Sequence, residues 1–208
     1  MKDSSILKLK QRLTQNLPGH LSHAKVMEHR KPVNGIDFQK RLPRKSAVLL
    51  HLYMHSGQLH LSYIERPEYQ GVHSRQISFP GGKAELEDVS LMQTAIREAQ
   101  EEVNIKLENL EVIGMLSEIY IPPSNFLVQP YVSFQKKRPN FIPDPREVSQ
   151  IIELPVKDLL NQKLAEHQIS AGKQQLRVNG YELKGKVMWG ATAMITTEFL
   201  DVFRELDS

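Results

Sequence analysis

The fold is decided by residues 79–105, which read FPGGKAELEDVSLMQTAIREAQEEVNI. Ser90 and Gln93 have the spacing of a capping box, which predicts a helix that begins just after Ser90. Asn104 is a residue type that often ends a helix in the left-handed conformation. The stretch therefore predicts a glycine turn, an acidic loop and a helix over 90–103.

The predicted helix has an apolar side and an acidic side. The apolar positions fall within one arc of the helix and are Met92, Ala95, Ile96, Ala99 and Val103. Glu98, Glu101 and Glu102 fall in the neighbouring arc, where like charges one turn apart destabilise a helix. Either this is a solvated acidic face or it binds a hard divalent cation, Mg²⁺ or Mn²⁺. Gly81 and Gly82 favour the second interpretation, because glycines let a backbone approach a ligand closely.

Helices and strands are mixed along the rest of the chain, which predicts an α/β fold. Strands are expected at 47–53, 59–64, 110–120, 126–134 and 148–153, and further helices at 4–17, 156–164 and 191–206. Residues 18–45 are rich in Pro, Gly and basic residues, so we expect a loop-heavy lead-in there. A last hairpin is expected over 176–186, with Asn179 and Gly180 at its tip.

The amino-acid composition excludes several kinds of site and partner. The chain has 208 residues, 40% of them hydrophobic, and no cysteine, which excludes disulfides, thiolate metal sites and a cysteine nucleophile. Its 27 Lys and Arg against 24 Asp and Glu give a net charge of +3, in short clusters rather than one stripe. We therefore expect no nucleic acid and no membrane as partner. The absence of a signal peptide and of cysteine predicts a cytoplasmic protein.

Arg97 to Ile105 match the second half of the Nudix box, R-E-U-x-E-E-x-G-U with U apolar, except that Asn104 replaces the Gly. Between Gly82 and Arg97 the chain has one residue more than the box, and Asp88 stands where the box has its first Glu. The coenzyme A pyrophosphatase branch of Nudix hydrolases has the same longer loop. Further segments resemble this branch in chain order, at 73–82, 124–130, 145–156 and 189–193.

The resemblance implies the Nudix α/β/α sandwich with a mixed central sheet, formed by residues 45–208 after an N-terminal helix and lead-in over 1–44. It implies a metal-dependent pyrophosphohydrolase that cleaves coenzyme A or acyl-coenzyme A to 3′,5′-ADP and (acyl-)phosphopantetheine. The partner is then a small nucleotide diphosphate, and a homodimer remains open. Two alternatives are a hydrolase of another nucleoside diphosphate derivative, such as ADP-ribose, and a non-catalytic ligand sensor.

The resemblance also implies roles for the residues of the acidic helix. Glu98 and Glu102 are expected to bind the metal, with the backbone carbonyl of Gly82 completing the site. Glu101 is expected to be a third ligand or the catalytic base, and Arg97 to orient it by a charge-assisted hydrogen bond. Glu147 is the other candidate for the base.

Three residues before the acidic helix are candidates for substrate binding: His73, Arg75 and Gly81. The branch normally has an Arg four residues before a Gly, whereas here Gly71 and Arg75 occupy these positions in exchanged order. Arg75 either reaches the same ligand from its new position or is a surface arginine.

Overall fold

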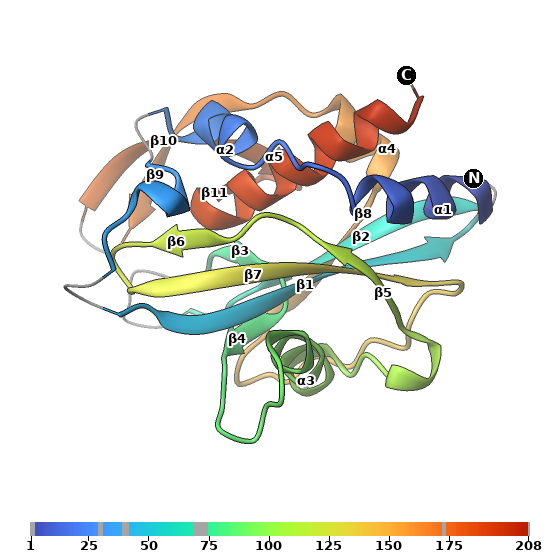
Figure 1. The fold of residues 1–208 in the computed structure, drawn as a ribbon. Helices are drawn as coiled ribbons and strands as arrows, with labels where there is room; N and C mark the ends of the chain where they lie inside the picture. The colour runs from blue at the N-terminus through green and yellow to red at the C-terminus, as the bar shows by residue number, and fades with distance from the viewer. Residues whose placement is uncertain (1–2, 29–30, 39–41, 69–74, 172–173, 208) are drawn as a thin grey trace.

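A mixed eight-stranded sheet lies between helices on both of its faces (Figure 1). The computed structural model describes residues 3–28, 31–38, 42–68, 75–171 and 174–207. In Figure 1, α1, α2 and α5 lie above the sheet and α3 lies below it. The predicted mixed α/β architecture is thus confirmed, and within the described residues no helix is long and apolar enough to cross a bilayer.

The strands of the main sheet pair mostly in antiparallel fashion. They are β1 (Arg44–His55), β2 (Gln58–Glu65), β3 (Ile77–Ser78), β4 (Gly81–Lys83), β5 (Glu111–Met115), β6 (Ile119–Ile121), β7 (Phe126–Gln135) and β8 (Gln150–Pro155). The exception is the long central pair, because β1 and β7 run parallel. A second antiparallel sheet is formed by β9 (Ala165–Ala171), β10 (Gln174–Leu183) and β11 (Lys186–Trp189).

Five α-helices and three short 3₁₀ helices are present in the described residues. They are α1 (Asp3–Arg12), α2 (His20–Val26), α3 (Leu91–Val103), α4 (Val156–Asn161), α5 (Gly190–Arg204), η1 (Val33–Gly35), η2 (Leu107–Asn109) and η3 (Glu205–Asp207). The predicted helix at 4–17 ends earlier, at Arg12. The predicted lead-in loop contains α2, whose buried Val26 belongs to the main core.

Alternation along the strands creates one core on each face of the sheet. Leu50 and Leu52 of β1 point to the upper core, which contains Phe199 of α5. Ala47 and Leu49 point to the lower core, where Ala99 of α3 is buried. The small side chains on this face of α3 let the helix lie close to β1, and this fixes where its acidic side lies.

The C-terminal hairpin differs from the prediction. Asn179 and Gly180 lie inside β10, and the turn falls at Lys184 and Gly185, both of which have positive φ. A Cβ at Gly180 would collide with the backbone carbonyl of Met188, so glycine is needed there for close strand approach. The strand β9 was not predicted, and the predicted strand at 110–120 is divided into β5 and β6.

Candidate active site

The helix α3 begins and ends where the sequence predicts. The Ser90 side chain accepts a hydrogen bond from the Gln93 N–H at 3.2 Å, and Gln93 Oε1 accepts one from the Val89 N–H at 2.8 Å. Asn104 adopts the left-handed conformation with φ 59°. Local signals alone therefore set the position of the carboxylates along this helix.

Three carboxylates converge beside this helix. One oxygen each of Glu98, Glu102 and Glu147 lies within 4.8 Å of the others. Glu147 comes from the loop before β8, which is held against the helix because the Asp144 N–H donates to the Glu102 carbonyl at 2.9 Å. Glu102 is buried, Glu98 is partly buried and Glu147 is exposed, so the cluster opens to solvent on the side of Glu147.

Burial makes negative charge unfavourable in this cluster. The pKa of Glu102 is raised to about 8, first by burial and to a smaller extent by the neighbouring charges of Glu98 and Glu147. The pKa of Glu98 is also raised, first by burial and then by Glu101 and Glu147, against the lowering effect of Arg97. Arg66 lies near Glu102, with 3.9 Å between Nη2 and Oε1, and partly offsets the effect. A bound cation would relieve this repulsion.

The two glycines of β4 let the backbone approach the carboxylates closely. Gly81 has φ 153°, and its N–H donates to Glu102 Oε2 at 2.9 Å. Gly82 pairs with Ala47 of β1, and a Cβ on Gly82 would collide with the Glu98 carboxylate. Gly81 needs glycine because a Cβ there would also collide with the Ala47 carbonyl, whereas a side chain at Gly82 would displace the Glu98 carboxylate.

Arg97 connects the acidic loop with the carboxylates. Its Nη1 donates to Glu98 at 2.9 Å and to Glu101 at 3.1 Å, and its Nη2 donates to the Lys83 carbonyl at 3.2 Å. On the other side it is paired with Asp88, whose side chain is only 3% exposed. The Thr94 hydroxyl and the Glu85 N–H donate to the same carboxylate. The longer loop is thus folded around a partly buried ion pair.

The predicted site residues do not all come together. Glu101 is bonded to Arg97 as expected, but its side chain is 60% exposed and it lies outside the three-carboxylate cluster. Gly81 uses its N–H to hold Glu102. Arg75 is exposed and lies 3.6 Å from Glu68. His73, like Gly71, lies outside the described residues.

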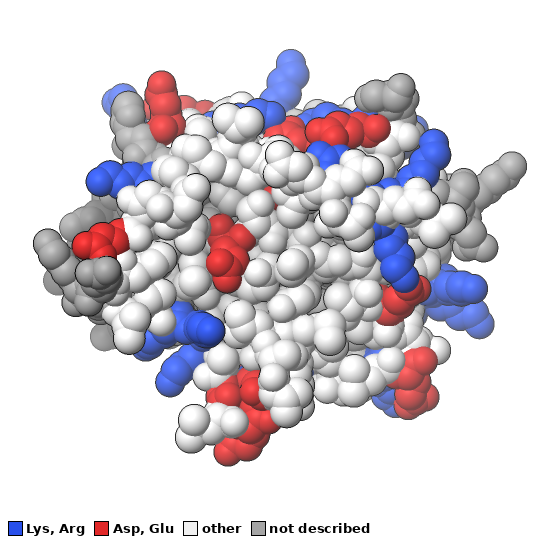
Figure 2. All heavy atoms as spheres, in the orientation of Figure 1, with Lys and Arg blue, Asp and Glu red and all other residues white. Residues whose placement is uncertain are grey.

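Arg66 is a site residue that the sequence reasoning missed. It follows β2 directly, and its side chain approaches the same carboxylate that Gly81 contacts. The available signal in the sequence was a cationic residue directly after the predicted strand at 59–64 and its neighbour Glu65. The acidic loop itself projects from the molecule, and Figure 2 shows acidic side chains gathered at the foot of the view, below most of the scattered Lys and Arg.

Comparison with known proteins decides the family. A NUDIX domain model matches residues 43–174. The chain belongs to the Nudix hydrolase family. It is 33% identical over 172 residues to the uncharacterized Nudix hydrolase NudL of Pectobacterium atrosepticum, covering 76% of this chain and 86% of that protein. The NudL protein of Photorhabdus laumondii is 36% identical over 124 residues, covering 59% of this chain and 66% of that protein.

Solved structures agree with the fold of this Nudix hydrolase. The MutT/nudix family protein of Enterococcus faecalis matches with a TM-score of 0.51 at 14% identity, covering 100% of this chain and 75% of that one. The RenU Nudix hydrolase of M. Smegmatis also has a TM-score of 0.51 at 14% identity, over 79% of this chain and 86% of that one. These structures confirm the predicted Nudix fold. The predicted pyrophosphohydrolase class is confirmed by the family model and by the NudL relatives.

The donor set fits the divalent cation that Nudix hydrolases use. All the candidate donors in the cluster are carboxylate oxygens, which Mg²⁺ and Mn²⁺ prefer. Two of the three carboxylates have raised pKa values, first because they are buried and then because neighbouring carboxylates repel their charge, and a bound divalent cation would offset both effects.

Proposed function

We propose that this Nudix hydrolase cleaves the diphosphate bond of coenzyme A or an acyl-coenzyme A, giving 3′,5′-ADP and phosphopantetheine or its acyl derivative. The cluster of Glu98, Glu102 and Glu147 is the main structural support for the proposed diphosphatase activity. The choice of coenzyme A rests on the resemblance to the coenzyme A pyrophosphatase branch. The longer loop that Asp88 and Arg97 hold in place is the part of that resemblance nearest to the site.

Glu98 and Glu102 are the proposed ligands of Mg²⁺ or Mn²⁺, with the Gly82 carbonyl as a further candidate. A bound divalent cation would neutralise charge on the diphosphate oxygens and make a coordinated water more acidic. The protein contributes by holding the ligands rigidly. Arg97 fixes Glu98, and the Gly81 N–H fixes Glu102.

The reaction forms a bond from a water oxygen to one phosphorus and breaks the bridging P–O bond, so that the leaving phosphate takes the electron pair. The water must lose a proton during this step. Glu147 is the proposed acceptor, because it is the exposed member of the cluster and lies next to both proposed ligands. Glu101 is then a positioning residue that shares Arg97 with Glu98. Arg66, which lies beside Glu102 and is partly exposed, is the proposed contact for a phosphate oxygen of the substrate.

A substrate panel tests this proposal. Coenzyme A, dephospho-coenzyme A and ADP-ribose are each incubated with the protein in Mg²⁺ or Mn²⁺, and the products are separated by chromatography. We expect the highest kcat/KM with coenzyme A. Cleavage of ADP-ribose with no cleavage of coenzyme A would contradict the proposed substrate but would support the diphosphatase activity. The absence of hydrolysis with every substrate and both metals would favour the sensor alternative.

A further inference from the structure

An ion pair with a buried carboxylate lies at the end of β2, directly before Arg66. The carboxylate belongs to Glu65, which is only 4% exposed, and the ammonium group belongs to Lys186 of β11 in the second sheet. A carboxylate is almost never buried to this extent without a charged partner. Among the described residues Lys186 is the one that forms an ion pair with Glu65, so the second sheet stabilises a charge of the main sheet.

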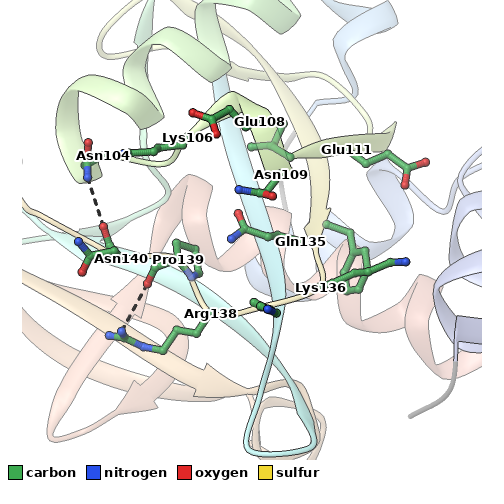
Figure 3. Close-up of a pocket in the computed structure, with 13 residues that line it drawn as sticks. Asn104, Lys106, Glu108, Asn109, Glu111, Gln135, Lys136, Arg138, Pro139 and Asn140 are labelled. Atoms are coloured by element: carbon green, nitrogen blue, oxygen red, sulfur yellow. Dashed lines mark hydrogen bonds between the residues drawn. The ribbon is translucent and has the colours of Figure 1, made fainter.

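The lysines beyond the C-terminal end of α3 differ from Lys186 in this respect. They line a hollow of about 830 Å³ and are Lys106, Lys136 and Lys137. All three are exposed and form no ion pair within the described part of the chain, and Figure 3 shows Lys136 extending away from the hollow. Lys186 is only partly exposed and is held in place by its partner, so its position is fixed by the fold.

Lys186 joins the end of β2 to the beginning of β8. Glu65 and Gln150 face each other in this pair of strands, and Lys186 Nζ donates to Glu65 Oε2 and, at 3.5 Å, to Gln150 Oε1. Ser149 adds two bonds beside this pair, because its N–H and its hydroxyl donate to the Glu65 carbonyl at 2.9 and 3.1 Å. The two strand ends are therefore held together by both backbone and side-chain bonds.

These two strand ends carry residues of the proposed active site. Arg66 directly follows Glu65, and Glu147 comes shortly before Gln150. Because side chains alternate along a strand, Glu65 points to the same face of the sheet as Tyr63 of the upper core. Arg66 points to the opposite face, where α3 lies. The ion pair thus holds the backbone from one face of the sheet, and the site residues act on the other.

We propose that Lys186 is a positioning residue for the diphosphatase reaction, and that it acts by fixing where Arg66 and Glu147 lie. This inference rests on the proposed function, in which Arg66 contacts a phosphate oxygen and Glu147 accepts a proton from water. Lys186 directly follows the turn at Lys184 and Gly185. The hairpin of the second sheet thereby takes part in the active site without contacting the substrate.

The proposed metal ligands are held independently of Lys186. Arg97 donates to Glu98 at 2.9 Å and the Gly81 N–H donates to Glu102 at 2.9 Å, and neither contact involves β11. Loss of the Lys186 bonds should therefore disturb phosphate binding and proton transfer and leave metal binding unchanged. A general weakening of the fold would affect all three.

Lys186→Met keeps most of the side-chain length and removes the charge. With the best substrate of the panel, we expect kcat/KM to fall by up to about a hundredfold, the loss for a reacting geometry displaced by about 1 Å. KM should rise through Arg66 and kcat should fall through Glu147, and Lys186→Arg should restore both. Lys184→Met, at an exposed position in the same hairpin, is the control and should leave both unchanged. A smaller folded fraction lowers kcat alone, so that result, or parent-level values, would overturn the proposal.

Combined variants show whether Lys186 acts through these two residues. In an Arg66→Gln background, Lys186→Met should still lower kcat but should no longer change KM. In a Glu147→Gln background, it should still raise KM but should no longer lower kcat. Full effects of Lys186→Met on both parameters in both backgrounds would overturn the proposal.

A variant that removes both charges guards against a failure to fold. Lys186→Met leaves the buried Glu65 charge without its partner, which can destabilise the protein strongly. The double variant Glu65→Gln/Lys186→Met has no unpaired charge, and we expect the same changes in KM and kcat from it. Parent-level KM and kcat in the folded double variant would overturn the proposal.

Two measurements without turnover separate the failure of this proposal from the failure of the proposed function. The affinity for Mn²⁺, measured by electron paramagnetic resonance, should be equal in the parent and in Lys186→Met. In EDTA, the Nε–Hε NMR resonance of Arg66 should shift in Lys186→Met, whereas that of Arg97, which Asp88 holds, should not. An unchanged Arg66 resonance, or equal shifts for both arginines, would overturn the positioning role. A parent protein that hydrolyses no substrate but shows the Arg66 shift would contradict the diphosphatase activity alone.

Discussion

Arg97 donates two hydrogen bonds to Asp88, from Nε to Oδ1 at 3.1 Å and from Nη2 to Oδ2 at 3.0 Å. The same guanidinium donates to Glu98, so one side chain joins the loop to a proposed metal ligand. The longer loop is thereby tied to the carboxylate helix. The pair also holds the pKa of Asp88 well below its ordinary value.

Asp88→Asn is expected to lower the free energy of unfolding by about 1–3 kcal/mol, because it weakens hydrogen bonds to a charged group. Since the folded state lowers the pKa of Asp88, this stabilisation is present above the unfolded value near 3.8 and is lost as the pH falls below it. Urea unfolding at pH 7 and pH 3 measures both effects. The exposed Glu87→Gln is the control, and equal stabilities of the two variants at pH 7 would contradict the role of the pair.

Glu102→Gln is expected to stabilise the metal-free protein, and to do so more at pH 8.5 than at pH 5. The folded pKa of about 8 is above the ordinary 4.5, so the contribution of protonated Glu102 is complete below 4.5 and lost as the pH rises through 8. Glutamine mimics the protonated form at every pH. Unfolding in EDTA at both pH values tests this, with the exposed Glu87→Gln as the control for the loss of one carboxylate outside the cluster. A pH-independent difference for Glu102→Gln would refute the burial argument.

Gly82→Ala is expected to retain the fold and to lower kcat by about tenfold or more, as for one displaced electrostatic contact. The added methyl group collides with the end of the Glu98 side chain, which can rotate away without unfolding the protein. Circular dichroism and kcat in Mn²⁺ measure the two quantities. Gly35→Ala is the control, because its Cβ would meet Pro32 at an ordinary 3.5 Å. Unchanged activity in Gly82→Ala would show that the Glu98 position does not matter.

Arg75→Ala tests how the substrate is chosen. If Arg75 contacts the 3′-phosphate of coenzyme A, its loss lowers kcat/KM for coenzyme A by roughly ten- to a hundredfold, the range for a charge-assisted bond. ADP-ribose, which lacks this phosphate, should be much less affected. The described partner of Arg75 is the exposed Glu68, so the guanidinium is accessible to a ligand. Equal losses on both substrates would indicate a disturbed loop instead.

The sequence predicted the parts of the site that local signals determine. The ends of α3 follow from Ser90, Gln93 and Asn104, and the three-dimensional position of Glu98 and Glu102 follows from helical spacing. The contribution of Glu147 to the cluster depends on backbone bonds between residues that are distant in the chain, such as Asp144 to Glu102. No local sequence pattern predicts such a contact, so only the resemblance to a family indicated a role for Glu147.

The prediction of a turn at Asn179 and Gly180 was wrong for a similar reason. The dipeptide is a strong local turn signal, but these residues pair with β9 on one side, where Gly180 faces Ala165, and Gly180 also faces Trp189 of β11. Strand pairing on both sides outweighs the local preference. Lys184 and Gly185, which also suit a tight turn, carry the positive φ values instead.

Hydrolysis of coenzyme A in ¹⁸O-labelled water, with Glu98→Gln and Glu102→Gln beside the parent, tests the central claim most directly. The account predicts that the parent with Mg²⁺ or Mn²⁺ releases 3′,5′-ADP and phosphopantetheine, one of which carries the label in its phosphate. Each variant should lower kcat by roughly two or more powers of ten, as expected for a lost electrostatic contact at the reacting group. Parent-level kcat in both folded variants would contradict the assignment of these two carboxylates.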